Sequence, residues 1–478
     1  MSLLNSGSRF LYDQVFDLVV GQIRAGSLQP GDRLPSLRRM SSQLKVSVAT
    51  VMQGYVSLEQ EGFIDAKPQS GYYVRLDSHD HTELPNPTTP QSIARDVRLE
   101  GLSQQMMALA RSNLAVPLAL ANLAAELLPG KALCRILHRV ANRDSARVLD
   151  YMDCQGDAEL RRQIAYRASK QGVLVDPEQI IITNGATEAL ALSLRSLTKL
   201  GDTVAVESPA YFSLLQLIEE FGLKAVEIPS HPRDGLDVDQ FEKVIKRLNV
   251  KALVCISNFN NPYGSLMPDK AKQRLVELAN ARDVRIIEDD IYGDLHFGTH
   301  RPRPISSFDQ SGNVVTCSSF SKTLAPGFRV GWLIADRGRA EMLSRKYTVS
   351  IANSSITQMA VIEFLANGGY DRHLRNLRRR LQIHVMRMRN ELAKTFPTGT
   401  RISEPQGGFV LWVELPGNVD VNKILERSLA QGISFLPGSL FTATGKYQNC
   451  MRISCGNSWT SEIQAGISRL AKIVLGCC

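Results

Sequence analysis

The sequence lacks any run of about 18 consecutive apolar residues, which a membrane-spanning helix would need. Its first ten residues are polar and contain no apolar signal core. The eight cysteines are scattered and show no metal-ligand spacing, and no internal repeat is found. These absences exclude the membrane-spanning class. They predict a cytoplasmic protein with reduced thiols and no bound metal.

The composition is that of an ordinary globular protein, with 478 residues, 44% hydrophobic and 22% charged. This length predicts two or three domains. The net charge of +9 suggests a nucleic-acid partner, but its distribution is uneven. Residues 1–76 contribute only +2. Part of the remaining excess comes from arginines at helical spacing between Arg372 and Arg389, which are typical of a solvated helix face.

The N-terminal residues 10–76 are predicted to form three helices and a short hairpin. Apolar residues recur at three- and four-residue steps, and Ser36 and Ser47 are suited to cap the second and third helices. The expected helices are 10–25, 37–44 and 48 to about 61, and the expected strands are 63–66 and 71–74. This order predicts a winged helix-turn-helix, which binds DNA in the major groove.

Two stretches of this domain, PGDRLPSLR (30–38) and QSGYYV (69–74), resemble the GntR family of bacterial regulators. The resemblance implies the following DNA-binding residues: Arg33, Arg38, Ser47, Thr50, Gln53, Ser70 and Gly71. Arg33 and Arg38 would contact phosphates or bases, and Ser70 and Gly71 would form the wing tip. The alternative is that the polar residues simply cover a helix surface. The family often has an arginine where this chain has Val48, which leaves the base preference open, although Val48 can contact a thymine methyl group.

Residues 77–112 are predicted to be a linker. Pro85, Pro87 and Pro90 lie in a polar stretch with few helix or strand signals, which favours an extended, semi-rigid chain. His79 and His81 in this stretch are interpreted as solvated residues, not metal ligands.

Residues 113–475 alternate between short apolar strands and helical stretches. The clearest strands are 180–182, 204–206, 252–256 and 284–287, a pattern that predicts a mostly parallel sheet covered by helices on both faces. A smaller α/β subdomain is expected from about residue 370, with residues 407–413 as its clearest strand.

The most distinctive stretch is SSFSKTLAPGFRVGW (318–332), in which Lys322 follows three serines and precedes Arg329 by seven positions. Burial lowers the pKa of a lysine, and such a lysine can form a Schiff base with an aldehyde cofactor. The alternative is a solvated lysine in a loop.

Three upstream motifs accompany this lysine, in order: NGATEAL (184–190), NPYG (261–264) and EDDIY (288–292). Together the four motifs resemble the fold-type I, class I aminotransferases, which use pyridoxal 5′-phosphate (PLP). The resemblance implies that Lys322 bonds to PLP and that Asp289 keeps the pyridine nitrogen protonated. Arg452 matches the arginine that binds a substrate carboxylate. The other implied PLP contacts are Asn261, Tyr292, Tyr211, Gly185, Ala186, Thr187, Ser319, Ser321 and Arg329.

Some of these residues also have ordinary structural explanations. Asp289 can be an acidic residue at a strand end, Tyr211 a core aromatic and Arg452 a strand residue paired across a sheet. Tyr151 lies in a segment that resembles the one lending a tyrosine to the neighbouring subunit's phosphate site, which implies a homodimer.

A GntR domain fused to an aminotransferase-like domain is the MocR subfamily, and this chain resembles it over nearly its whole length. The resemblance implies a bacterial, cytoplasmic regulator that binds operator DNA at the nucleoid and senses PLP or a PLP–amine adduct. Two alternatives stay open. One is a working aminotransferase that carries a DNA-binding domain, and the other is a PLP-sensing regulator without catalysis.

Overall fold

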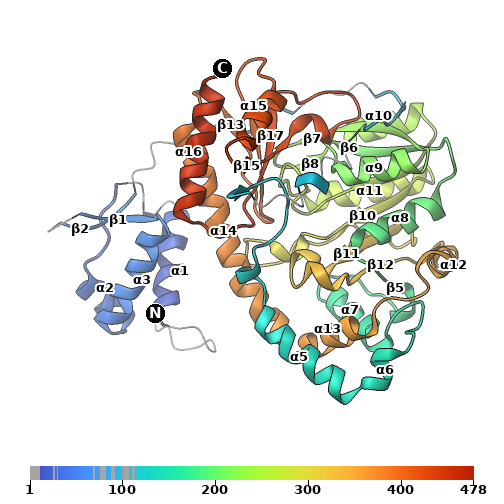
Figure 1. The fold of residues 1–478 in the computed structure, drawn as a ribbon, viewed down its shortest axis with the longest axis horizontal. Helices are drawn as coiled ribbons and strands as arrows, with labels where there is room; N and C mark the ends of the chain where they lie inside the picture. Colours follow the sequence, from blue (N-terminus) through green and yellow to red (C-terminus); the bar gives the residue numbers. More distant parts are fainter. Residues whose placement is uncertain are drawn as a thin grey trace. The chain divides into compact units, whose positions relative to one another are not determined.

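The computed structural model describes residues 11–24, 27–28, 31–67, 70–75, 82–87, 92–99, 101, 107–109 and 114–477. The chain divides into two compact units, Met1–His81 and Thr82–Cys478 (Figure 1). The sequence motif residue Gln69 and the linker histidines His79 and His81 lie outside the described residues.

The first unit contains three helices and a two-stranded antiparallel hairpin. The helices are α1 (Leu11–Arg24), α2 (Leu37–Leu44) and α3 (Val48–Gln60), and the strands are β1 (Ile64–Lys67) and β2 (Gly71–Val74). Ser36 and Ser47 cap α2 and α3, because their hydroxyls accept hydrogen bonds from the backbone N–H groups of Arg39 and Thr50. The predicted winged helix-turn-helix is therefore confirmed.

The core of this unit is formed by apolar residues at helical spacing on α1 and α3. Val15 and Val19 on α1 and Val51, Tyr55 and Leu58 on α3 are fully buried. The Tyr55 hydroxyl donates to the carbonyl of Pro35 at 2.9 Å, so the turn before α2 is fixed to the third helix.

The second unit is built on a large sheet with the strand order β3-β7-β6-β9-β10-β11-β12-β5, and β8 pairs with β7. The strands from β7 to β11 run parallel, whereas β12 is antiparallel to both of its neighbours. Their bounds are β3 Arg95–Asp96, β5 Ile180–Thr183, β6 Thr203–Ser208, β7 Lys224–His231, β8 Gly235–Leu236, β9 Val250–Cys255, β10 Arg285–Asp289, β11 Val314–Ser319 and β12 Gly331–Ile334.

Helices cover both faces of this sheet, as the continuous apolar strands require. One apolar core joins the sheet to α8, α9 and α12, and another joins it to α10 and α11 (Figure 1). The helices of this part are α5 Gly130–Arg143, α6 Ser145–Leu149, α7 Ala158–Ser169, α8 Ala186–Leu197, α9 Phe212–Glu220, α10 Val238–Arg247, α11 Asp269–Ala281, α12 Arg339–Ser350 and α13 Ser355–Ala366.

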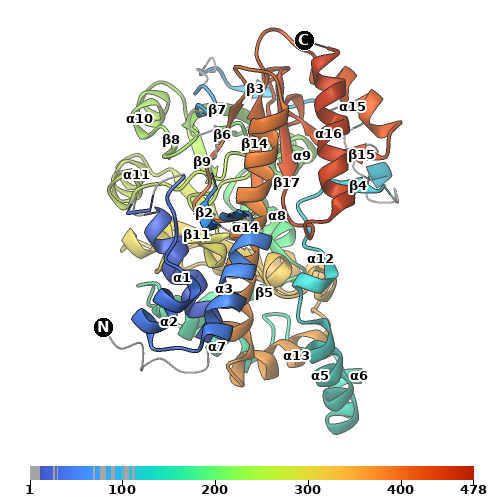
Figure 2. The ribbon, with the colours of Figure 1, turned by 90° about the vertical axis from the view of Figure 1, so that its left-hand side faces the viewer.

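A smaller subdomain follows, built on a second sheet in the order β13-β14-β17-β16. The long helix α14 and the C-terminal α16 lie side by side in it (Figures 1 and 2). Its elements are α14 Gly369–Thr395, β13 Arg401–Ile402, β14 Val410–Glu414, α15 Val421–Leu429, β15 Ile433–Ser434, β16 Leu436–Pro437, β17 Cys450–Ser454 and α16 Ser461–Leu475, and β15 pairs with β4 (Val116–Pro117).

The arginines of α14 are less uniformly solvated than the sequence predicts. Arg378, Arg380 and Arg389 are only partly exposed and donate to the backbone carbonyls of Asp294, Glu126 and Thr82. Arg372 and Arg375 are exposed, as expected. The partly buried arginines thus satisfy the carbonyls of two short 3₁₀ turns and of the segment at Thr82.

Within the described residues, no helix is long and apolar enough to span a bilayer. The same residues contain no group of three or more His, Cys, Asp or Glu that could hold a metal ion.

Candidate functional site

A cavity of about 520 Å³, including its open mouth, lies where the ends of β10 and β11 meet the start of α8. This is the carboxyl edge of the parallel strands, where α/β sheets bind their ligands. It brings together nine of the predicted PLP residues: Ala186, Thr187, Tyr211, Asn261, Asp289, Tyr292, Ser321, Lys322 and Arg329.

Lys322 ends a short 3₁₀ turn (Phe320–Lys322) directly after β11. Its Nζ atom donates to the carbonyl of Ala121 at 2.7 Å. Burial, and secondly the nearby Arg452 cation, lower the pKa of Lys322 to about 8. Roughly one tenth of the lysine is therefore neutral at pH 7, and nucleophilic attack on an aldehyde requires this form.

Asp289 is the last residue of β10 and is 4% exposed. Burial, and secondly the adjacent Asp290 carboxylate, raise the pKa of Asp289 to about 7. Among the described residues, neither its Oδ1 atom nor the Oδ1 atom of Asn261 has a hydrogen-bond partner. Buried acceptors without partners are costly, so these two oxygens suit a ligand that donates protons.

Two tyrosines complete the wall of the cavity. Burial raises the pKa of Tyr292, whose hydroxyl is hydrogen-bonded to the Asn261 side chain. Tyr211 lies at the N-terminus of α9, and burial raises its pKa as well. Both phenols therefore stay protonated at neutral pH and act as neutral hydrogen-bonding groups.

The start of α8 lies at the cavity, and helix N-termini favour anions. Gly185 precedes the helix with φ of +83°, and a Cβ atom there would lie 2.3 Å from Nη2 of Arg329. Arg329 donates to the carbonyl of Asn184 at 2.7 Å and to the Ser321 hydroxyl at 3.5 Å. The Ser319 and Ser321 hydroxyls lie 2.7 Å apart, so Ser319 supports Ser321 from outside the cavity lining.

Arg452 lies on β17 and is 1% exposed. Its Nη2 atom donates to the carbonyl of Ala119, whereas Nε and Nη1 have no partner within the described part of the chain. Burial lowers the pKa of Arg452 to about 10. Lys322 and Arg452 thus bond to carbonyls two residues apart in the segment that follows β4. Sequence patterns miss Ala119 and Ala121, because these residues act only through their backbone.

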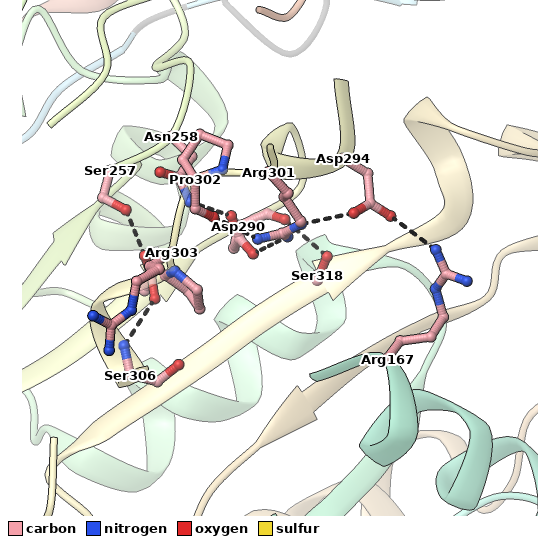
Figure 3. Close-up of polar contacts among 12 residues, drawn as sticks. Arg167, Ser257, Asn258, Asp290, Asp294, Arg301, Pro302, Arg303, Ser306 and Ser318 are labelled. Carbon is pink, nitrogen blue, oxygen red and sulfur yellow. Dashed lines mark hydrogen bonds and ion pairs between the residues drawn. The ribbon is translucent and has the colours of Figure 1, made fainter. Parts of the chain in front are cut away.

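A buried ionic network surrounds Asp290, the residue that follows Asp289 in the chain (Figure 3). Arg301 bonds to Asp290 at 2.5 Å and to Asp294 at 2.7 Å, and Arg167 approaches Asp294 at 3.9 Å. Asn258 also donates to the Asp290 carboxylate, at 2.9 Å. The network compensates the charge of Asp290 and so limits its effect on Asp289. The residues of this network come from separate segments of the chain. In the sequence, only the adjacent acids of the EDDIY motif indicate it.

The predicted DNA-binding residues lie on the first unit. Arg33, Arg38, Ser47 and Gln53 are exposed, and Arg33 lies beside the wing, since a Cβ atom on Gly71 would come within 3.5 Å of its guanidinium. Gly71 has φ of +110°.

The hydroxyls in this surface are already engaged within the unit. Those of Ser47 and Thr50 lie 2.7 Å apart, and that of Ser70 lies 2.7 Å from the Tyr73 hydroxyl. On the outer face of α3, Val48 and Met52 are 44% and 52% exposed, a pair that the sequence motifs do not single out together.

Comparisons with known proteins agree with the division of the chain into two units. Residues 11–74 match the model of the gntR family of bacterial regulatory proteins, and residues 120–470 match that of aminotransferase class I and II. The chain is 35% identical to the uncharacterized HTH-type transcriptional regulator YjiR of Escherichia coli (strain K12), over 97% of this chain and 98% of that protein. It is 30% identical to aromatic-amino-acid aminotransferase 1 of Thermococcus litoralis, over 73% and 86% of the two chains.

Solved structures lead to the same fold. The kynurenine aminotransferase of Pyrococcus horikoshii, solved in complex with PMP, aligns with a TM-score of 0.73 and 28% identity. The alignment covers 79% of this chain and 95% of that one. The class I aminotransferase fold indicates pyridoxal phosphate as the cofactor, and the buried oxygens of Asp289 and Asn261 suit its proton donors.

Proposed function

The chain belongs to the MocR subfamily of GntR regulators, in which a winged helix-turn-helix is fused to a class I aminotransferase domain, and we propose that it regulates transcription in response to PLP or a PLP–amine adduct. The observation that carries the proposal is the co-occurrence, in one chain, of a complete DNA-binding fold and a cavity that collects nine candidate PLP residues. Its site of action would be operator DNA in a bacterial nucleoid.

We assign the residues that line the cavity, together with Gly185 and Ser319 beside it, as follows. Lys322 bonds to the cofactor's aldehyde, Asp289 holds the proton on the pyridine nitrogen, and Asn261 and Tyr292 bind the phenolic oxygen. Tyr211 stacks on the ring. The start of α8 at Gly185, Ala186 and Thr187 binds the phosphate together with Ser319, Ser321 and Arg329. When bound, PLP supplies an electron sink and an aldehyde that captures amines.

Arg452 would bind the carboxylate of an amino-acid effector through Nε and Nη1. The DNA contacts are assigned to Arg33, Arg38, Ser47, Thr50, Gln53, Ser70 and Gly71. Because the Ser47, Thr50 and Ser70 hydroxyls are engaged locally, we expect them to position the backbone more than to read bases.

A homodimer is part of the proposal. Leu149 and Tyr151 are 88% and 81% exposed, and Tyr347 and Val349 on α12 are also exposed. Large exposed apolar side chains favour a protein interface. In the class I pattern, Tyr151 serves the partner's phosphate site, which would require it to be exposed in an isolated chain.

A second candidate function is amino-group transfer. Its support is the 30% identity to aromatic-amino-acid aminotransferase 1 over 73% of this chain, together with Lys322 in the cavity. The two functions share every residue of the cavity.

The test uses purified full-length protein with PLP. Absorption at about 420 nm, fixed to the chain by borohydride, should appear with the parent protein and be lost with Lys322→Ala. Gel shifts on selected genomic DNA at one salt concentration should then change with PLP for the parent only. If DNA affinity is the same with and without PLP, sensing fails as a function and amino-group transfer becomes the leading candidate.

A further inference from the structure

The beginning of the predicted linker is bound to the edge of the small subdomain. The Ile402 N–H donates to the Glu83 carbonyl at 3.1 Å, and the Glu83 carboxylate pairs with Arg401 at 2.7 Å. The Glu414 carboxylate accepts from the Asn86 backbone N–H at 2.7 Å and from its side-chain amide at 2.9 Å. We call these five residues the anchor site.

The anchor site resembles strand addition, in which an extended segment pairs with the open edge of a sheet. β13 is a two-residue edge strand, and the Glu83 carbonyl satisfies the N–H of Ile402 on its open side. Pro85 between the two anchoring residues is buried. Proline restricts the unbound chain to extended conformations, so holding this segment costs little conformational entropy. Backbone pairing, a carboxylate–guanidinium pair and a buried proline act together here, whereas an isolated surface ion pair would contribute little.

Further along the predicted linker, the chain is held by the large sheet. Residues Arg95–Asp96 form β3 and pair with β7, and Val97 is 4% exposed. The Leu99 N–H donates to Glu219 at 3.0 Å. Much of the described part of residues 77–112 is therefore attached to the second unit.

The anchor site shortens the free connection to the DNA-binding domain. Arg75 is the last described residue of the first unit, and Glu83 lies only eight residues further on. Eight residues span at most about 29 Å when fully extended. Without the anchor site, the chain would next be held at Arg95 on β3, and the 20 residue steps from Arg75 would span up to about 72 Å. Anchoring at Glu83 therefore reduces the maximum reach roughly 2.5-fold.

The anchor site also belongs to the sheet that carries Arg452. Arg401 on β13 pairs with Glu414 on β14, and Trp412 on β14 pairs with Arg452 on β17. The separation from β13 to β17 is two strand spacings, or about 10 Å. A hydrogen-bonded sheet moves as a unit, so any displacement of β17 reaches the segment at Glu83 and Asn86.

We propose that the small-subdomain sheet holds the DNA-binding domain on a short connection through the anchor site, and that a carboxylate bound at Arg452 acts on DNA binding through this sheet. The short connection follows from the contacts of this chain alone, whereas the response to ligand rests on the proposed function. In a dimer, two short connections restrict the distance between the two DNA-binding domains and so restrict the half-site spacing.

The test compares full-length parent protein with Glu83→Ala/Asn86→Ala, which removes the two anchoring side chains and leaves the sheet intact. The matched control is Glu462→Ala/Gln464→Ala, which removes one acid and one amide from the exposed face of α16 in the same subdomain. PLP binding, followed by absorbance, should be the same for all three proteins.

The first readout is hydrogen exchange of peptides that contain Ile402. In the parent and the control, this amide should exchange at least tenfold more slowly than in the anchor variant.

The second readout is the affinity for DNA. The parent first selects a DNA fragment from random sequences, and 5 base pairs are then inserted between the half-sites of this fragment. The insertion should weaken binding at least tenfold for the parent and control, and less than threefold for the anchor variant.

Equal exchange at Ile402 in parent and anchor variant, or equal loss of affinity on the insertion, overturns the short connection. If adding a mixture of amino acids to the PLP-loaded proteins changes the DNA affinity of the parent and the anchor variant by the same factor, the route through the sheet is wrong while the proposed function stands. If neither PLP nor PLP with the amino acids changes the parent's DNA affinity, the proposed function fails, and the two readouts still decide the short connection.

Discussion

Replacing Asp289 by asparagine tests the assignment of the pyridine partner. The substitution keeps the volume of the side chain at a position that is 4% exposed but removes its charge. A hydrogen bond to a charged group contributes about 1.5–3 kcal/mol. At 1.4 kcal/mol per factor of ten, PLP should bind roughly 10- to 150-fold more weakly to Asp289→Asn at pH 8.

The pKa of Asp289 also predicts how the PLP affinity changes with pH. Without ligand, the pKa of Asp289 is raised to about 7. A protonated pyridine beside it stabilises the carboxylate, so the pKa of Asp289 is lower in the complex, and affinity is lost as the pH falls below about 7. The amide side chain of the Asp289→Asn variant cannot titrate. The ratio of the two dissociation constants should therefore shrink about tenfold between pH 8 and pH 6.

The assay is an absorbance titration of PLP into both proteins at pH 6, 7 and 8. Titrating groups of PLP affect both proteins alike, whereas the pKa of Lys322 falls further when the Asp289 charge is removed, because that carboxylate raises it. Asp239→Asn, at an acid whose side chain is 66% exposed on α10, serves as the control for charge removal. Equal affinity of parent and Asp289→Asn, or a ratio that stays constant across the three pH values, would show that another carboxylate holds the pyridine proton.

Three further predictions concern other parts of the chain. Borohydride should no longer trap PLP covalently in Lys322→Ala. Lys346→Ala, at a buried lysine outside the cavity lining, should keep the trapping. Trapping that persists in Lys322→Ala refutes the assignment. Light scattering should give a dimer mass near twice 52.9 kDa, and Tyr151→Asp together with Leu149→Asp should shift it toward the monomer. Val48 and Met52 should contact thymine methyl groups. Replacing operator thymines by deoxyuridine should therefore weaken DNA binding by the parent by about 0.8 kcal/mol, or roughly fourfold, per buried methyl. DNA binding by Val48→Ala/Met52→Ala should not weaken on the same replacement. Equal losses for both proteins would exclude these side chains as the thymine contacts.

Local sequence signals predicted the DNA-binding unit well. The α2 helix spans Leu37–Leu44 and β2 spans Gly71–Val74, as expected, because caps and turn residues act over a few positions. The four motifs of the body also converge in one cavity. Motif chemistry is concentrated at strand ends and helix starts, which the parallel sheet places at one edge.

Features set by tertiary contacts escaped prediction. Arg301 contacts Asp290 and Asp294 only because the chain between them folds back, and no local sequence pattern predicts that contact. The arginines of α14 have the spacing of a solvated face, yet Arg378 donates to the Asp294 carbonyl. An extended proline-containing segment has no periodicity, so its attachment at Glu83 and Asn86 left no signal either.

The two cations that we assign to ligand binding share one further property that bears on sensing. Lys322 donates to the Ala121 carbonyl and Arg452 to the Ala119 carbonyl, so both cations hold one short segment after β4. A lysine bonded to an aldehyde must give up its donation, worth about 1.5–3 kcal/mol for a charged donor, whereas Arg452 can bind a carboxylate through Nε and Nη1 and keep Nη2 on Ala119. PLP alone, bonded to Lys322, therefore releases the Ala121 carbonyl. An amino acid joined to PLP through its amine displaces Lys322 from the aldehyde, so the lysine can donate to Ala121 again while Arg452 engages the carboxylate. The site can therefore distinguish the cofactor from its amino-acid adduct by whether Lys322 holds Ala121, and this distinction needs no catalytic turnover.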